Sequence, residues 1–196
     1  DRDIFLQVGG AKTGLYVYVN GQEVGYSEDS KNPADFLINK YLHPGSDNVI
    51  TFVIYKYTTG SYLEDQDMWR LGGIERDVVL YSQPKAHIRD FKVVSTLDDN
   101  YQNGVFRLKV DIANHTNAKQ EFDVSYEIVD VRNEKKVISN GVSETSIEAG
   151  QENYTQCQEA TIPDVHKWSA EDPYLYTLLI TLKDKVKNTV LEIVPF

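Results

Sequence analysis

One stretch of the sequence, residues 60–78 (GSYLEDQDMWRLGGIERDV), concentrates the residue types that could do chemistry. Within nineteen residues it holds five carboxylates, two arginines, a tryptophan, a tyrosine and three glycines. Paired carboxylates can act as general acid and base, but the acid needs a raised pKa and neighbouring arginines lower it. Ionised carboxylates instead accept hydrogen bonds from hydroxyl groups or bind cations. The stretch therefore favours binding over proton transfer, and Asp67 is the candidate ligand residue.

The same stretch shows neither strand alternation nor a helical apolar stripe, which predicts a long structured loop. Two interpretations remain open from composition. In one, an acidic group of the loop binds a ligand; in the other, the loop is a surface segment held by Arg70 and Arg76. Trp69 and Tyr62 likewise either stack on the apolar face of a sugar or pack at the edge of the core.

Other chemistry-bearing residues are sparse. The four histidines are far apart in the sequence and none has a partner at metal-ligand spacing: His43, His87, His115 and His166. Phosphate-binding and nucleophile motifs are missing, and Cys157 has no neighbouring histidine or basic residue that would lower its pKa. The sequence thus assigns no catalytic residue to this chain. One cysteine excludes an internal disulfide and leaves the compartment undecided between the cytoplasm and a periplasmic or exported location.

Charge and composition exclude several classes of partner. The net charge of −10 argues against nucleic acid, because phosphate binding needs a clustered cationic face. No run approaches about 20 consecutive apolar residues, so we expect no membrane span. The chain opens directly into a strand-like run without a start methionine, which we expect of a segment cut from a longer polypeptide.

The first 82 residues predict short strands, at 4–8, 15–19, 22–26, 48–57 and 78–81. Asn20-Gly21 between two of them is a strong hairpin signal, because both turn positions need positive φ. Residues 36–42 predict one or two helical turns. The run at 48–57 is apolar on both faces, which predicts a strand buried between two layers.

Beyond a boundary at 82–84 the pattern becomes regular, with about seven short strands separated by turn signals. Apolar residues alternate with polar ones along 106–112, 122–128 and 174–182, as in an antiparallel sandwich. The sequence therefore predicts an all-β chain of two domains, 1–82 and 83–196. The second domain would be immunoglobulin-like in architecture.

Three runs resemble the β-galactosidases of glycoside hydrolase family 2, and they occur in that family's order. Residues 61–70 (SYLEDQDMWR) with 73–78 (GIERDV) resemble the signature of the sugar-binding domain. Residues 19–30 (VNGQEVGYSEDS) resemble a second run of that domain, and 168–176 (WSAEDPYLY) resemble a segment of the first immunoglobulin-like domain.

The resemblance implies that residues 1–82 are the C-terminal part of a jelly-roll, galactose-binding-like domain whose first strands are absent. Residues 83–196 would be the immunoglobulin-like domain that precedes a catalytic (β/α)₈ barrel. The barrel, with two catalytic glutamates and a magnesium site, would lie beyond Phe196. This chain by itself would then be inactive.

For the site, the resemblance implies one residue. In the family, the aspartate at the position of Asp67 binds sodium and helps to hold the galactosyl 6-hydroxyl, and this role is not extended to Asp65 or Glu64. The implied partners are a β-galactoside, the chain's own barrel domain and further subunits of a homo-oligomer. Some members extend a long loop from the second domain to a neighbouring subunit, and the corresponding region here, 143–154, is shorter.

Two other functions remain open from the residues. The aromatic and acidic loop would also suit a stand-alone carbohydrate-binding or adhesion module. A purely structural spacer is the third possibility, in which neither sodium nor sugar has any effect.

Overall fold

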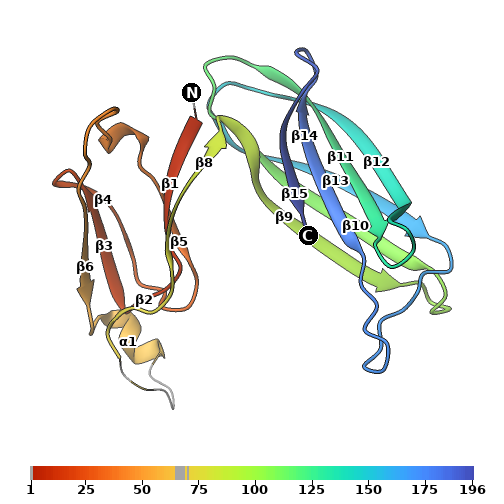
Figure 1. Cartoon of the computed structure of the whole chain (residues 1–196), viewed down its shortest axis with the longest axis horizontal. Coiled ribbons are helices and arrows are strands. Elements are labelled where there is room, and N and C mark those ends of the chain that lie inside the picture. Colours follow the sequence, from red (N-terminus) through yellow and green to blue (C-terminus); the bar gives the residue numbers. More distant parts are fainter. Residues whose placement is uncertain (1, 65–68, 70) are drawn as a thin grey trace. The chain divides into compact units, whose positions relative to one another are not determined.

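The computed structural model describes residues 2–64, 69 and 71–196. The chain divides into two compact units, Asp1–Gln83 and Pro84–Phe196 (Figure 1). Regular structure in the described residues is almost entirely β, with one six-residue α-helix and one short 3-10 helix. The predicted all-β class is confirmed. The described part of the chain contains no helix long and apolar enough to cross a membrane.

The first unit is a small sandwich of short strands. Its elements are β1 (Arg2–Val8), β2 (Ala11–Lys12), β3 (Gly14–Val19), β4 (Gln22–Ser27), β5 (Ala34–Leu37), η1 (Asn39–Tyr41), β6 (Ile50–Tyr55), α1 (Thr59–Glu64), β7 (Gly73–Ile74) and β8 (Val78–Pro84). One sheet has the order β5-β1-β8 and another has the order β4-β3-β6, while β2 pairs with β7. Alternate residues of β1 and β3 meet in one apolar core, because successive side chains of a strand point to opposite faces.

The hairpin prediction at Asn20-Gly21 is confirmed. These two residues join β3 to β4 and have φ angles of 50° and 78°. Positive φ at both turn positions matches the right-handed twist of the paired strands. The Asn20 side chain also donates to the Tyr41 carbonyl at 2.8 Å, which ties the hairpin to η1.

The expectation that the strand at 48–57 is covered on both faces is wrong. The strand is β6, and it lies at an edge of the β4-β3-β6 sheet. Phe52 and Ile54 pack against the core, but Val53 and Tyr55 on the other face are exposed. Apolar residues on both faces of a strand do not by themselves show that a second layer covers it.

The second unit is a seven-strand sandwich, as predicted. Its strands are β9 (Ala86–Leu97), β10 (Gly104–Asn114), β11 (Gln120–Asp130), β12 (Lys136–Ile147), β13 (Gln151–Ile162), β14 (Thr177–Asp184) and β15 (Thr189–Pro195). They form two antiparallel sheets of order β13-β10-β9 and β12-β11-β14-β15 (Figure 1). The connection between β12 and β13 is a turn at 148–150.

The core of the second unit follows the alternation in the sequence. Phe106, Leu108 and Val110 of β10 are buried, and so are Phe122 and Val124 of β11. Inward-facing residues of the two sheets interdigitate, and each apolar side chain buried in this way contributes about 1.5–3 kcal/mol relative to its exposed state.

Asn114 at the end of β10 is a buried polar residue that joins the two sheets. Its side-chain amide donates to the carbonyls of Ala118, Ile147 and Glu148 at 3.0–3.1 Å. Its oxygen accepts hydrogen bonds from the backbone and hydroxyl of Thr116. Asn114 also begins a match to the glycosylation sequon, but a fully buried amide with these bonds cannot be an acceptor in the folded chain.

Candidate functional site

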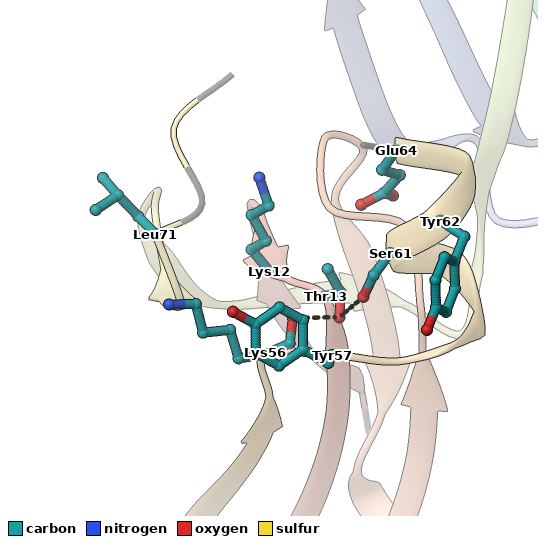
Figure 2. A pocket seen from close by; sticks show the side chains of 8 residues that line it. All are labelled: Lys12, Thr13, Lys56, Tyr57, Ser61, Tyr62, Glu64 and Leu71. Atoms are coloured by element: carbon teal, nitrogen blue, oxygen red, sulfur yellow. Dashed lines mark hydrogen bonds between the residues drawn. The ribbon is translucent and has the colours of Figure 1, made fainter. Parts of the chain in front are cut away.

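A cavity of about 220 Å³ lies in the first unit where β2, the end of β6 and α1 meet (Figure 2). Its walls combine two amines, hydroxyl groups, aromatic rings and one carboxylate. The lining residues are Lys12, Thr13, Lys56, Tyr57, Ser61, Tyr62, Glu64 and Leu71. A concave site with a few converging polar groups is the usual form of a small-molecule site.

Buried hydroxyl groups hold one wall of this cavity. Thr13 is buried, and its Oγ1 lies 3.1 Å from both the Lys56 carbonyl and Ser61 Oγ (Figure 2). The same Oγ1 lies 3.0 Å from the Tyr55 carbonyl. Ser61 Oγ in turn accepts a hydrogen bond from the Thr58 backbone at 2.7 Å. These contacts join the start of α1 to the residue between β2 and β3 and to the end of β6.

The predicted loop at 60–78 is partly regular. Its first residues belong to α1 and Gly73–Ile74 form β7. The helix buries none of its residues. The backbone N–H of Gly60, in its first turn, has no partner within the helix and donates a hydrogen bond to Glu28 Oε2 at 3.0 Å. The periodicity could not show this helix, because tertiary hydrogen bonds stabilise it and an apolar stripe does not.

Large apolar side chains around the same stretch are exposed. Tyr62 and Trp69 are 87% and 85% exposed, and Leu63 and Leu71 are exposed as well. Neither aromatic ring packs at the edge of the core, so that interpretation is wrong. Exposed aromatic rings beside a cavity that contains hydroxyl groups are suited to stack on the apolar face of a sugar.

Asp67, the predicted substrate and sodium ligand, lies outside the described residues, as do Asp65 and Arg70. The nearest described residue before this segment is Glu64. Glu64 and Leu71 both line the cavity. Lys12 Nζ also donates to the Trp69 carbonyl at 3.3 Å, which connects this stretch to β2.

Two acidic residues of the stretch have partners that the sequence did not indicate. Glu64 accepts hydrogen bonds from the Ser30 backbone at 2.9 Å and from the Ser30 hydroxyl. Glu75 forms an ion pair with Lys31 at 2.8 Å. The hydrogen bond from Lys31 is the largest cause of the lowered pKa of Glu75, and the charges of Lys12 and Arg76 act in the same direction.

Sequence reasoning therefore missed Glu28, Ser30 and Lys31. All three lie in or directly after the run at 19–30, which resembles a run of the family's sugar-binding domain. That run was the available signal. Its contact with residues 60–76 depends on tertiary structure, because about thirty residues separate the partners.

A second, polar cavity of about 600 Å³ lies in the second unit beside the run at 168–176. Asp172 there accepts hydrogen bonds from His166 at 2.7 Å and from Arg132 at 2.9 Å. Both of these residues also contact the Tyr174 ring. The Tyr174 hydroxyl donates a hydrogen bond to Asp130 Oδ1 at 2.6 Å, and this bond raises the pKa of Tyr174 to about 12. The cluster joins the turn after β11 to the segment before β14.

Asp172 predicts a pH dependence of stability. The bonds from His166 and then Arg132 lower its pKa below the ordinary value of 3.8. These bonds therefore stabilise the folded unit above that value, and the contribution is lost as the pH falls through the folded-state pKa. We expect Asp172→Asn to lower the midpoint of thermal unfolding at neutral pH, with a difference from wild type that shrinks below pH 3.8.

The matched control is Glu171→Gln, which removes an adjacent exposed charge. It should follow the wild-type profile at every pH. Thermal unfolding followed by circular dichroism across this range makes the measurement, and identical profiles for Asp172→Asn and wild type would contradict the prediction.

Two histidines that are far apart in the sequence are neighbours in the second unit. The rings of His87 and His115 lie 5.3 Å apart and meet edge to face. Antiparallel pairing of β9 with β10 brings them together. His87 Nδ1 also lies 2.9 Å from the Pro84 carbonyl, and His115 Nε2 lies 3.4 Å from Glu152.

Comparisons with known proteins agree with this architecture. Residues 2–84 match the model of the glycosyl hydrolases family 2 sugar binding domain, and residues 86–194 match the model of glycosyl hydrolases family 2. A β-galactosidase of Priestia megaterium is 39% identical over 97% of the chain, and one of Halalkalibacterium halodurans is 37% identical over 98%. The chain spans 18% of the length of each of these two curated relatives.

Solved structures show the same fold. The crystal structure of a Bacteroides uniformis β-glucuronidase covers 99% of the chain with a TM-score of 0.90 at 20% identity, and the chain covers 24% of it. A family 2 member from Bacteroides cellulosilyticus covers 100% with a TM-score of 0.83 at 15% identity, and the chain covers 26% of it. The predicted jelly-roll and immunoglobulin-like sandwiches are thereby confirmed. The chain belongs to glycosyl hydrolases family 2.

Proposed function

We propose that this chain is the non-catalytic N-terminal region of a retaining β-galactosidase that hydrolyses terminal β-D-galactosides. Its loop around Asp67 contributes to an active site in a barrel that lies outside the chain. The observation that carries the proposal is the cavity of the first unit, where Glu64 and Leu71, on either side of Asp67, lie among hydroxyl and aromatic groups. The identity to two named β-galactosidases supports the choice of substrate.

Within this proposal Asp67 binds sodium and accepts a hydrogen bond from the galactosyl 6-hydroxyl. Sodium takes oxygen ligands, and the described walls of the cavity do not favour a cation. Lys12 and Lys56 carry positive charge there, and both oxygens of Glu64 are hydrogen-bonded to Ser30. The assignment of sodium to Asp67, and of magnesium to the barrel, rests on the resemblance to the family 2 β-galactosidases.

The full-length protein is expected to release nitrophenol from a nitrophenyl β-galactoside, and the 196-residue chain is expected to release none. A nitrophenyl β-glucuronide is the comparison substrate, because it differs at the sugar C6 that Asp67 would contact and in the configuration at C4. Preference for the glucuronide, or activity of the chain alone, would contradict the proposal.

A stand-alone carbohydrate-binding or adhesion module is the second candidate, and the exposure of Tyr62 and Trp69 favours it. A group of tyrosines on the β4-β3-β6 sheet of this unit is less suited to a sugar. Tyr26 and Tyr55 are inclined at 41° and 74° to the Tyr16 ring, so the three do not form one flat surface. Calorimetric titration of the chain with galactose and lactose separates the candidates: part of an active site should give no detectable heat, whereas a module should bind.

A further inference from the structure

The turn at residues 28–31 contacts helix α1, which precedes Asp67 in the sequence. One carboxylate from the turn and one from the helix make these contacts. Glu28 accepts a hydrogen bond from Gly60 at the first turn of α1, with an N···O distance of 3.0 Å. Glu64, the last residue of α1, accepts from the backbone and the hydroxyl of Ser30. Ser30 is only 1% exposed, so these charge-assisted bonds are shielded from competing water. The helix is therefore held at both ends by residues 28–30.

The same turn contacts the far end of the loop. Lys31 Nζ pairs with Glu75 at 2.8 Å, and the Lys31 carbonyl accepts a hydrogen bond from Arg76 at 2.8 Å. Glu75 also donates its backbone N–H to the Gly10 carbonyl at 2.9 Å, next to the pairing of β2 with β7. Residues 28–31 thus contact both sides of the segment that contains Asp67.

Asp29 makes this turn rigid. Its carboxylate accepts hydrogen bonds from the backbone N–H groups of Lys31 and Asn32 at 3.0 and 3.1 Å, and from the Asn32 amide at 2.6 Å. An aspartate that bonds to the backbone two and three residues ahead pre-organises a turn. The pKa of Asp29 is lowered by these bonds, first by that from the Asn32 side chain.

We propose that residues 28–32 (EDSKN) position the Asp67 loop, and that the contact between Ser30 and Glu64 is the main one. Asp67 follows Glu64 by three residues, so the backbone at Glu64 sets where the loop begins. A ligand carboxylate loses function when its supporting contacts allow it to move, because productive geometry tolerates only small displacements. Ser30 and Glu64 act through Asp67 and touch neither sodium nor sugar. This inference rests on the proposed function.

The test uses the full-length protein with Glu64→Ala, Glu64→Gln and Ser30→Ala. We expect Glu64→Ala to raise the sodium concentration for half-maximal galactosidase activity about tenfold, and to speed amide hydrogen exchange in residues 65–72. Ser30→Ala removes only the hydroxyl bond and should have a smaller effect. Glu64→Gln should recover most of the wild-type behaviour, because an amide can accept from the Ser30 backbone and donate to its hydroxyl.

Glu23→Ala is the matched control, since Glu23 is an exposed carboxylate of the same unit that accepts a hydrogen bond from the Tyr18 hydroxyl of the β3–β4 hairpin at 3.5 Å. Unchanged sodium dependence and exchange in Glu64→Ala would overturn the inference, and so would equal defects in Glu64→Ala and Glu64→Gln. Asp67→Ala in the same assay distinguishes a failure of the positioning inference from a failure of the proposed function. If Asp67→Ala loses sodium dependence and Glu64→Ala keeps it, only the positioning inference fails; if Asp67→Ala keeps it, the proposed function fails.

Discussion

Replacing Asp67 by alanine in the full-length protein is expected to lower kcat/KM for a β-galactoside by about 100-fold or more while the protein remains folded. Removing one preorganised group that holds substrate in its reactive position typically costs about 10²–10³ in rate. In the proposed function, the loss should fall on both kcat and KM, because the 6-hydroxyl and sodium contacts would form in the ground state and become stronger in the transition state. Activity should also no longer respond to added sodium.

Two further variants sharpen this expectation. Asp67→Asn keeps an oxygen that can accept a hydrogen bond but loses the negative charge, so it should lose sodium activation more completely than sugar binding. Asp65→Ala removes a carboxylate two residues away for which no ligand role is proposed, and it should stay near wild type. Steady-state kinetics at several sodium concentrations make the measurement. Near-normal turnover by the Asp67→Ala variant would contradict a role for Asp67 in the active site.

Asn114→Ala is expected to destabilise the second unit by about 2–4 kcal/mol, a large share of the stability of an ordinary domain. The substitution leaves the carbonyl of Ile147 without its donor in a buried position and removes the bonds to Ala118 and Glu148. Since β10 and β12 belong to different sheets, the change also loosens the connection between them. A surface substitution would change stability by no more than about 0.5 kcal/mol.

Asn117→Ala is the matched control, because Asn117 is exposed in the same turn. Urea unfolding of the chain, followed by circular dichroism, measures both variants. A loss below about 1 kcal/mol in Asn114→Ala would mean that water replaces the missing amide.

Local signals in the sequence were sufficient for several features. Asn20-Gly21 predicted a hairpin because its backbone angles are a property of the two residues themselves. The alternation along β10 and β11 predicted a buried face because strand geometry repeats every two residues. The strand at 48–57 was predicted less well. Its composition favours burial, but whether a second layer covers it depends on other segments of the chain.

The sequence by itself determined the all-β class, the strands of the second unit and the family resemblance. The choice of Asp67 among five carboxylates rests on that resemblance and stays a prediction. Only the tertiary structure decided how the surrounding loop is held. The short helix α1, the bonds of Glu64 to Ser30 and the pair of Glu75 with Lys31 join segments about thirty or more residues apart. Charge counts predict that such carboxylates need partners, but the identity of each partner is set by which segments the fold brings together.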